Sequence, residues 1–274
     1  MTGDGRLARG LGTGDAVVLG LGAMIGAGVF TAFAPAARAA GAGLLVGLAV
    51  AAVVAYCNAR SSARLAARYP ESGGTYVYGR ERLGPFWGYL AGWGFVVGKT
   101  ASCAAMALTV VAYAAPGLGQ PWRGLCAVGV VAVLTAVNYV GMHRSALATR
   151  VLVTVGLGVL GAAVLALLLA GGPDPARLAP FPGTDPTGVL QAAGLLFFAF
   201  AGYARIATLG EEVRDPARTI PRAIPLALGT VLLVYAAVAV AVLLVVGPAA
   251  LGAHADPVAY AVSTTAWSGL APVV

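Results

Sequence analysis

The sequence contains few charged residues. Asp, Glu, Lys and Arg make up 10% of its 274 residues, whereas a soluble domain carries roughly a quarter. Hydrophobic residues account for 59%. This composition argues against a soluble globular protein and predicts an integral membrane protein.

Residues that could hold a metal or perform catalysis are also scarce. The three cysteines, Cys57, Cys103 and Cys126, all lie in apolar segments and lack the spacing of metal ligands. We interpret them as small packing residues. The apolar segments contain no paired catalytic carboxylates, Ser–His pair or metal cluster, so an intramembrane enzyme is the least favoured class and no cofactor is expected.

Apolar segments recur along the chain, and several reach the roughly 20 residues needed to cross about 30 Å of hydrocarbon. Seven spans are predicted at residues 15–40, 44–66, 85–115, 124–139, 150–170, 188–210 and 224–246. An eighth begins near Pro257 and is still running at Val274. The chain stops without the polar tail that normally follows a last span, so we expect a C-terminally truncated fragment of a longer protein.

The net charge of +7 could indicate a nucleic-acid partner, but its distribution argues for a topology signal instead. If the N-terminus is cytoplasmic and the spans alternate, the outside holds only Arg38, Arg123 and Arg177. The inside then holds Arg6, Arg9, Arg60, Arg64, Arg68, Arg80, Arg82, Arg144, Arg150, Arg205, Arg214, Arg218 and Arg222. This bias is the positive-inside rule. We predict a multi-pass plasma-membrane protein with a cytoplasmic N-terminus, lipid contacts and no nucleic-acid partner.

The first span contains the stretch GLGAMIGAGVF, in which two glycines fall near the middle of the membrane. Glycine is a poorer helix former than alanine by about 1 kcal/mol. Unwinding there would expose amide N–H groups and direct the positive end of the next half-helix at the same point, which suits a carboxylate. The residues concerned are Ile25, Gly26, Ala27 and Gly28. The Gly22–Gly26 spacing equally fits close helix packing, so both interpretations remain open.

The sixth span contains a second candidate break, in the stretch LLFFAFAGYARIATLGEE. Gly202 lies near its middle with aromatic residues on both sides. Unwinding would present backbone carbonyls, which suit an ammonium group. The residues concerned are Phe200, Ala201, Gly202 and Tyr203. Interrupted helices in corresponding positions of two halves indicate a transporter binding site, so the two spans together are predicted to hold a zwitterion.

The segment between the second and third spans is YPESGGTYVYGRERLGPFWGYLAGW. Pro70, Gly73 and Gly74 interrupt the helix, and aromatic residues follow at positions suited to the membrane interface. We predict a short amphipathic element under the cytoplasmic side of the membrane.

These three stretches, together with the loop EVRDPARTIPRAI that follows the sixth span, resemble motifs of the amino acid–polyamine–organocation superfamily of permeases. The resemblance implies an all-α, five-plus-five inverted-repeat bundle with broken first and sixth helices. Residues 1–274 would form one transmembrane domain, with a first repeat over about 15–170 and the start of a second over about 188–274. It also implies amino acid transport by alternating access, with the substrate carboxylate at residues 25–28 and its amine and side chain at residues 200–202.

The sequence departs from this family at two positions. Ala204 stands where many relatives have an acidic residue, so a carboxylate for a cationic side chain is missing. Gly156 stands where some relatives carry a lysine in the fifth span. A neutral amino acid is therefore preferred as substrate, and proton coupling through a fifth-span lysine is not supported.

Lys99 is the only lysine. It follows Pro85 by 14 residues, or about 21 Å along a helix, and so falls inside the hydrocarbon region, where an ionisable residue is costly. We hypothesise that Lys99 faces the bundle interior and replaces a coupling cation or carries a proton. Snorkelling along a tilted helix, or a static bridge to a buried acceptor, are the alternatives.

The favoured function is secondary active transport of amino acids, with proton coupling or exchange. A channel would need polar rings along a continuous path, and the predicted spans lack them. A non-transporting membrane scaffold is the other alternative, and it predicts no ligand-dependent stabilisation.

Overall fold

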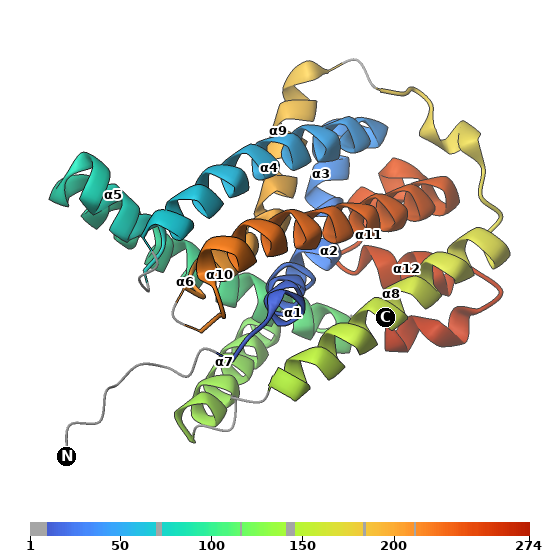
Figure 1. Ribbon diagram of the computed structural model, residues 1–274. Helices are drawn as coiled ribbons and strands as arrows, with labels where there is room; N and C mark the ends of the chain where they lie inside the picture. Colours follow the sequence, from blue (N-terminus) through green and yellow to red (C-terminus); the bar gives the residue numbers. More distant parts are fainter. Residues whose placement is uncertain (1–9, 70–72, 116, 141–145, 183–184, 211) are drawn as a thin grey trace.

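The computed structural model describes residues 10–69, 73–115, 117–140, 146–182, 185–210 and 212–274. All regular elements in these ranges are helices (Figure 1). The first half contains α1 (Thr13–Met24), α2 (Ala27–Thr31), α3 (Phe33–Ala40), η1 (Gly41–Gly43), α4 (Leu44–Arg68), α5 (Thr75–Leu83), α6 (Pro85–Ala114) and α7 (Trp122–Val140). The second contains α8 (Ala146–Ala170), η2 (Pro175–Leu178), α9 (Pro186–Phe200), α10 (Tyr203–Ala207), α11 (Pro216–Ala253), α12 (Pro257–Ser263) and η3 (Ser268–Val273).

Six helical segments of the described ranges are long and apolar enough to cross a membrane. They are Thr13–Phe30, Phe33–Arg68, Pro85–Ala114, Trp122–Tyr139, Thr149–Ala170 and Pro216–Ala253. A shorter apolar helix, Pro186–Phe200, covers the first part of the predicted sixth span. The prediction of an all-α polytopic membrane bundle is confirmed, and the first and sixth spans are both interrupted.

Small residues on α4 determine how closely the bundle packs. Gly47 and the alanines that follow it at four-residue intervals point to the same side of the helix, and all are buried. This side consists of Gly47, Ala51, Ala55, Ala59 and Ala63. Small side chains let helix backbones approach closely, and a Cβ atom on Gly47 would lie 3.0 Å from that of Ala192 on α9. The α4 helix therefore packs tightly against α9 and α11.

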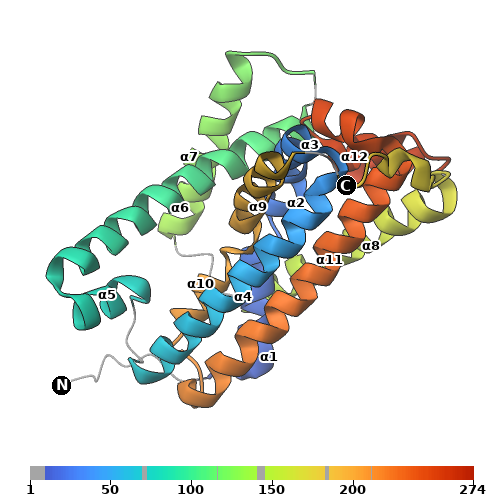
Figure 2. The same ribbon diagram turned by 90° about the horizontal axis from the view of Figure 1, so that it is seen from above.

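The long helix α11 lies at the centre of the bundle and packs against α1, α3, α4 and α8. By contrast, α6 and α7 project to one side as a hairpin (Figure 2), joined by a small core of Ala107, Val111 and Ala127. Most of the α6 surface is exposed in the described structure, because α6 packs mainly against α5 and α7.

One end of the bundle gathers most of the arginines and is called the arginine-rich end below. It contains the start of α1, the end of α4, the helix α5, and the start of α11 (Figure 2). Its described arginines include Arg60, Arg64, Arg68, Arg80, Arg82, Arg205, Arg214, Arg218 and Arg222. The predicted short element between the second and third spans is the helix α5.

The eighth span predicted from Pro257 does not form. Helix α12 has 7 residues and ends at Ser263, and η3 follows it. Hydroxyl groups explain the interruption, because those of Ser263, Thr264 and Thr265 donate to carbonyls three residues earlier, at 2.7, 2.7 and 2.8 Å. Such bonds compete with the helical hydrogen bonds of the backbone. The division into two inverted repeats stays a prediction.

Candidate functional site

The first span is interrupted at Ile25 and Gly26. The last regular bond of α1 joins the Ile25 amide to the Leu21 carbonyl at 2.7 Å. The Gly26 amide then donates to the Met24 carbonyl at 3.0 Å across Ile25, whose φ and ψ are −79° and 82°. These values define an inverse γ-turn, and α2 begins at Ala27 without a side-chain cap. The predicted break is present, and the amides at the start of α2 have no side-chain partner.

The second break has a different form. Helix α9 ends at Phe200 and α10 begins at Tyr203, but Ala201 and Gly202 keep right-handed dihedral angles. The Ala201 amide bonds the Phe198 carbonyl at 3.1 Å, so the backbone tightens to the i→i+3 pattern of a 3₁₀ helix. The position of this break agrees with the prediction. The predicted unwinding of the backbone is wrong, because Ala201 and Gly202 stay helical.

A single side chain from α11 joins the two breaks. The Tyr235 hydroxyl lies 2.6 Å from the Met24 carbonyl oxygen and 3.1 Å from the Ala199 carbonyl oxygen. Its ring is fully buried and lies 5.4 Å from the ring of Phe200, between centroids. Both carbonyls belong to helix ends, where the regular acceptor pattern stops. Tyr235 thus supplies a donor at the point where α1 and α9 are interrupted.

Two glycines allow the interrupted helices to touch. A Cβ atom on Gly202 would lie 2.4 Å from the Ala23 carbonyl oxygen. A Cβ atom on Gly28 would lie 2.8 Å from the backbone Cα of Ala199. Real Cβ atoms do not approach backbone so closely, so a larger residue at Gly202 would force α1 away from the start of α10, and one at Gly28 would force α2 away from α9. A Cβ atom on Gly22 would lie 3.1 Å from a side-chain atom of Val153 on α8, so the close-packing interpretation of the Gly22–Gly26 spacing applies at most to Gly22.

Gly26 differs from these glycines because it has open space beside it. A Cβ atom there would meet nothing within 4 Å, and Gly26 lines a cavity of about 360 Å³. The opposite wall comes from α6, through Met106, Thr109 and Tyr113. The Tyr113 hydroxyl oxygen is buried and has no hydrogen-bond partner of normal geometry among the described residues, with the backbone of Val258 nearby.

Ile25 faces a second cavity, of about 270 Å³, on the other side of the break. Gly22 and Gly156 line it together with Thr149, Leu152 and Val153 of α8. Gly156, where some similar permeases carry a lysine, therefore faces the first break. None of the described residues that line this cavity is charged.

The structure does not bring all the predicted site residues around one cavity. Phe200 lines an apolar groove between α4 and α11, and Tyr203 lines a cavity beside α4, α5 and α6. Gly28 and Gly202 are in helix contacts. Ala201 lies in the turn between α9 and α10, and the Ala27 side chain lies outside the described residues.

Lys99 does not face the interior of the described bundle. Its side chain is exposed on α6, and its Nζ atom lies 5.7 Å from the centroid of the Phe95 ring, one helical turn earlier. Among the described residues it forms no ion pair with a carboxylate. The coupling role of Lys99 stays a prediction.

Contacts at the arginine-rich end hold both interrupted helices in place. Asp15 in the first turn of α1 pairs with Arg150 of α8. The backbone of Leu11 pairs with the segment after α10, through the Glu212 carbonyl at 3.2 Å and the Arg214 amide at 2.9 Å. Any separation of α1 from α8 and α10 would have to break these contacts.

Sequence reasoning missed Tyr235 and Tyr113. A signal for Tyr235 was present, since Thr230 and Tyr235 are the only polar side chains in the predicted seventh span. A lone hydroxyl in hydrocarbon needs an acceptor. Tyr113 had no comparable signal, because it lies close to the end of its span.

A family model described as amino acid permease matches residues 11–270, nearly the whole chain. The chain belongs to the amino acid permease family. This membership agrees with the motifs at the two breaks, and with the expectation of a membrane carrier rather than an enzyme. With the apolar helices, it makes the chain part of a multi-pass membrane protein.

Related proteins are named as transporters. The chain is 67% identical over 268 residues to an uncharacterized transporter of Mycobacterium tuberculosis, covering 98% of this chain and 60% of the relative. It is 29% identical to a branched-chain amino acid permease of Bacillus subtilis, covering 86% of this chain and 55% of that protein. A methylthioribose transporter of Bacillus subtilis shares 28% identity, with 98% and 62% covered. The chain thus spans about 60% of the length of the curated relatives it matches.

Proposed function

We propose that the full-length protein is a secondary transporter of neutral amino acids that works by alternating access in the plasma membrane, with a cytoplasmic N-terminus. The observation that carries the proposal is the meeting of two interrupted helices inside an apolar bundle, next to a cavity. Irregular backbone at membrane depth is tolerated where it lines a cavity or is buried in protein. Family membership and the names of the relatives add independent support.

The substrate carboxylate is assigned to the break at residues 25–28. The amides at the start of α2 lack a side-chain cap, and α2 continues into α3 through Ala32, whose dihedral angles are helical. The positive end of this combined half-helix lies at the break, where it favours an anion. Gly26 leaves space for that anion, and the Tyr113 hydroxyl across the cavity supplies a further donor.

The amine and side chain are assigned to Phe200, Ala201, Gly202 and Tyr203. None of these residues lines the cavity at Gly26 in the described conformation, so the proposal requires that α9 and α6 approach each other when substrate binds. Such rearrangement is expected of alternating access, in which one part of the bundle moves against the other.

A neutral substrate fits the lining of the cavity. Phe30, Met106 and Val110 are apolar, and no described residue lining the cavity is acidic or basic. A cationic side chain would find no carboxylate there. The volume of about 360 Å³ lies within the lower range of small-molecule pockets, which begins near 300 Å³.

Counterflow in proteoliposomes tests this function. Proteoliposomes that contain the full-length protein and are loaded with an unlabelled branched-chain amino acid should accumulate the labelled form of that amino acid. Labelled lysine should enter them poorly. Methylthioribose belongs in the same screen because of the relative that carries its name. Tyr113→Phe should weaken apparent substrate affinity, because it removes the hydroxyl donor that faces the carboxylate site. Absence of counterflow with every amino acid would contradict the proposal, and ion conductance in its place would favour a channel.

A further inference from the structure

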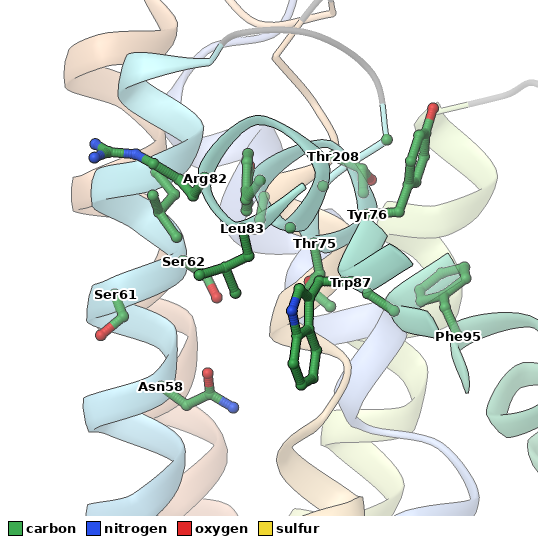
Figure 3. A pocket seen from close by; sticks show the side chains of 18 of the residues that line it. Asn58, Ser61, Ser62, Thr75, Tyr76, Arg82, Leu83, Trp87, Phe95 and Thr208 are labelled. Atoms are coloured by element: carbon green, nitrogen blue, oxygen red, sulfur yellow. The ribbon is translucent and has the colours of Figure 1, made fainter. Parts of the chain in front are cut away.

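A separate cavity of about 570 Å³ lies at the arginine-rich end, between α4, α5, α6 and the region of α10 (Figure 3). This cavity is separate from the cavity at Gly26, because the two share no lining residue. The transport proposal does not use it.

Polar groups from α4 face this cavity. Asn58 and Ser62 of α4 point toward Trp87 of α6 (Figure 3). The Asn58 carboxamide makes no hydrogen bond with a described residue. The groove between α4 and α11, by contrast, is lined almost entirely by aliphatic side chains. The Asn58 carboxamide is therefore available for a hydrogen bond to a ligand in this cavity.

Tyr78 of α5 adds a buried donor. Its side chain is only 4% exposed and lines the cavity, and its hydroxyl has no partner among the described residues. Burial raises the pKa of Tyr78 to about 12, so the hydroxyl keeps its proton at neutral pH. Buried hydroxyls in native proteins nearly always have a partner, so the Tyr78 hydroxyl is expected to donate to an acceptor outside the described residues.

The charge of the cavity selects an anion. Among the described residues that line it, Arg82 is the only one that is charged at neutral pH. It forms no ion pair with a described carboxylate, and its guanidinium carbon lies 5.8 Å from the centroid of the Tyr69 ring. An acceptor that carries negative charge would satisfy Arg82 and Tyr78 together.

The side of the cavity formed by α6 is apolar and favours an apolar part of a ligand. Trp87, Leu90 and Phe95 line it and are 51%, 43% and 51% exposed. Residues 87–95 cover about 12 Å along the helix, from the interfacial aromatic residues toward the centre of the span. A ligand that fills the cavity therefore has an anionic head and a long apolar part.

We propose that this cavity binds an anionic phospholipid, with its phosphate at Arg82 and Tyr78 and an acyl chain along Trp87, Leu90 and Phe95. Basic pockets between membrane helices on the cytoplasmic side are suited to such headgroups, because the cytoplasmic leaflet is rich in anionic lipid. The site would place a lipid against α10, the half-helix that follows the second break.

Native mass spectrometry of the full-length protein tests the proposal, and it does not depend on transport. One phosphatidylglycerol per chain should stay bound under conditions that remove phosphatidylcholine. Arg82→Gln should lower phosphatidylglycerol affinity about 10-fold, as expected for the loss of a charged hydrogen bond. Tyr78→Phe should lower it without a change of charge. The matched control is Arg64→Gln, which removes an exposed arginine from the same end without touching the cavity.

Three results would overturn the proposal. Equal loss of affinity in Arg82→Gln and Arg64→Gln would mean general surface attraction. Competition by glycerol 1-phosphate would mean a site for a free phosphate compound. A photoreactive amino acid at Asn58 of the full-length protein should crosslink to lipid, and a crosslink to the remainder of the chain, or to a second copy, would show that protein fills the cavity instead.

Discussion

The Tyr235 hydroxyl lies 2.6 Å from the carbonyl oxygen of Met24, the last residue of α1. The same hydroxyl is 3.1 Å from the Ala199 carbonyl near the end of α9. A hydroxyl has one proton, so it can donate fully to only one of these acceptors at a time. The contact thus links the two breaks through one hydroxyl group.

Tyr235→Phe should destabilise the protein by about 1 kcal/mol, because it removes a buried hydrogen bond to the helix-end carbonyls, of which Met24 keeps the Gly26 amide as a donor. The ring and its packing against Phe200 would remain. Thermal unfolding and substrate uptake by the full-length protein measure the effect. Tyr139→Phe is the control, since Tyr139 is 93% exposed. Equal unfolding temperatures for Tyr235→Phe and the parent protein would show that the bond contributes nothing.

Gly202→Ala should lower stability and abolish uptake, because the added methyl group would lie 2.4 Å from the Ala23 carbonyl oxygen. Backbone at that position cannot yield without separating the start of α10 from α1. The matched control is Gly194→Ala in the preceding helix α9, where an added Cβ meets nothing within 4 Å. That control should be neutral or more stable by roughly 0.5–1 kcal/mol. Similar behaviour of the two variants would contradict the proposed close contact.

Arg150→Gln should favour separation of α1 from α8, since it removes the partner of Asp15. An exposed pair contributes at most about 1 kcal/mol, so the expected result is a shift between conformations and little change in folding. Labelling of a cysteine introduced at Thr149, in a background without the native cysteines, should become several-fold faster. Arg150→Lys should restore the slower rate, and unchanged labelling in Arg150→Gln would argue against a latch at this end.

Lys99→Met should flatten the pH dependence of uptake if Lys99 carries the coupling charge. The exposed ammonium on an otherwise apolar part of α6 supports such a role, because a charge facing lipid at that depth is costly. In the full-length protein we expect a further partner there. Lys99→Arg keeps the charge and serves as the control. The same rate and pH profile in Lys99→Met as in the parent protein would remove the hypothesis.

Local sequence patterns predicted the spans and the position of both breaks, because glycine placement and apolar length act locally. They could not predict how the second break is formed. Ala201 and Gly202 keep helical dihedral angles, and the Tyr235 hydroxyl, 36 residues away in the sequence, bonds the neighbouring Ala199 carbonyl. The false eighth span has a similar cause, since apolar content suggested a helix where hydroxyl groups at residues 263–265 end one. Contacts between segments that are far apart in the sequence also place the predicted site residues Gly26, Phe200 and Tyr203 in separate cavities.

The central claim is that the two breaks hold both charged ends of one amino acid. Thermal stabilisation of the full-length protein measures this most directly, with the preferred amino acid compared with its methyl ester and its 2-hydroxy acid analogue. A ligand that binds only the folded state raises the unfolding temperature. We predict a clear rise with the amino acid and little with either analogue. An equal rise with an analogue that lacks one charge, or no rise with any of the twenty amino acids, would contradict the account.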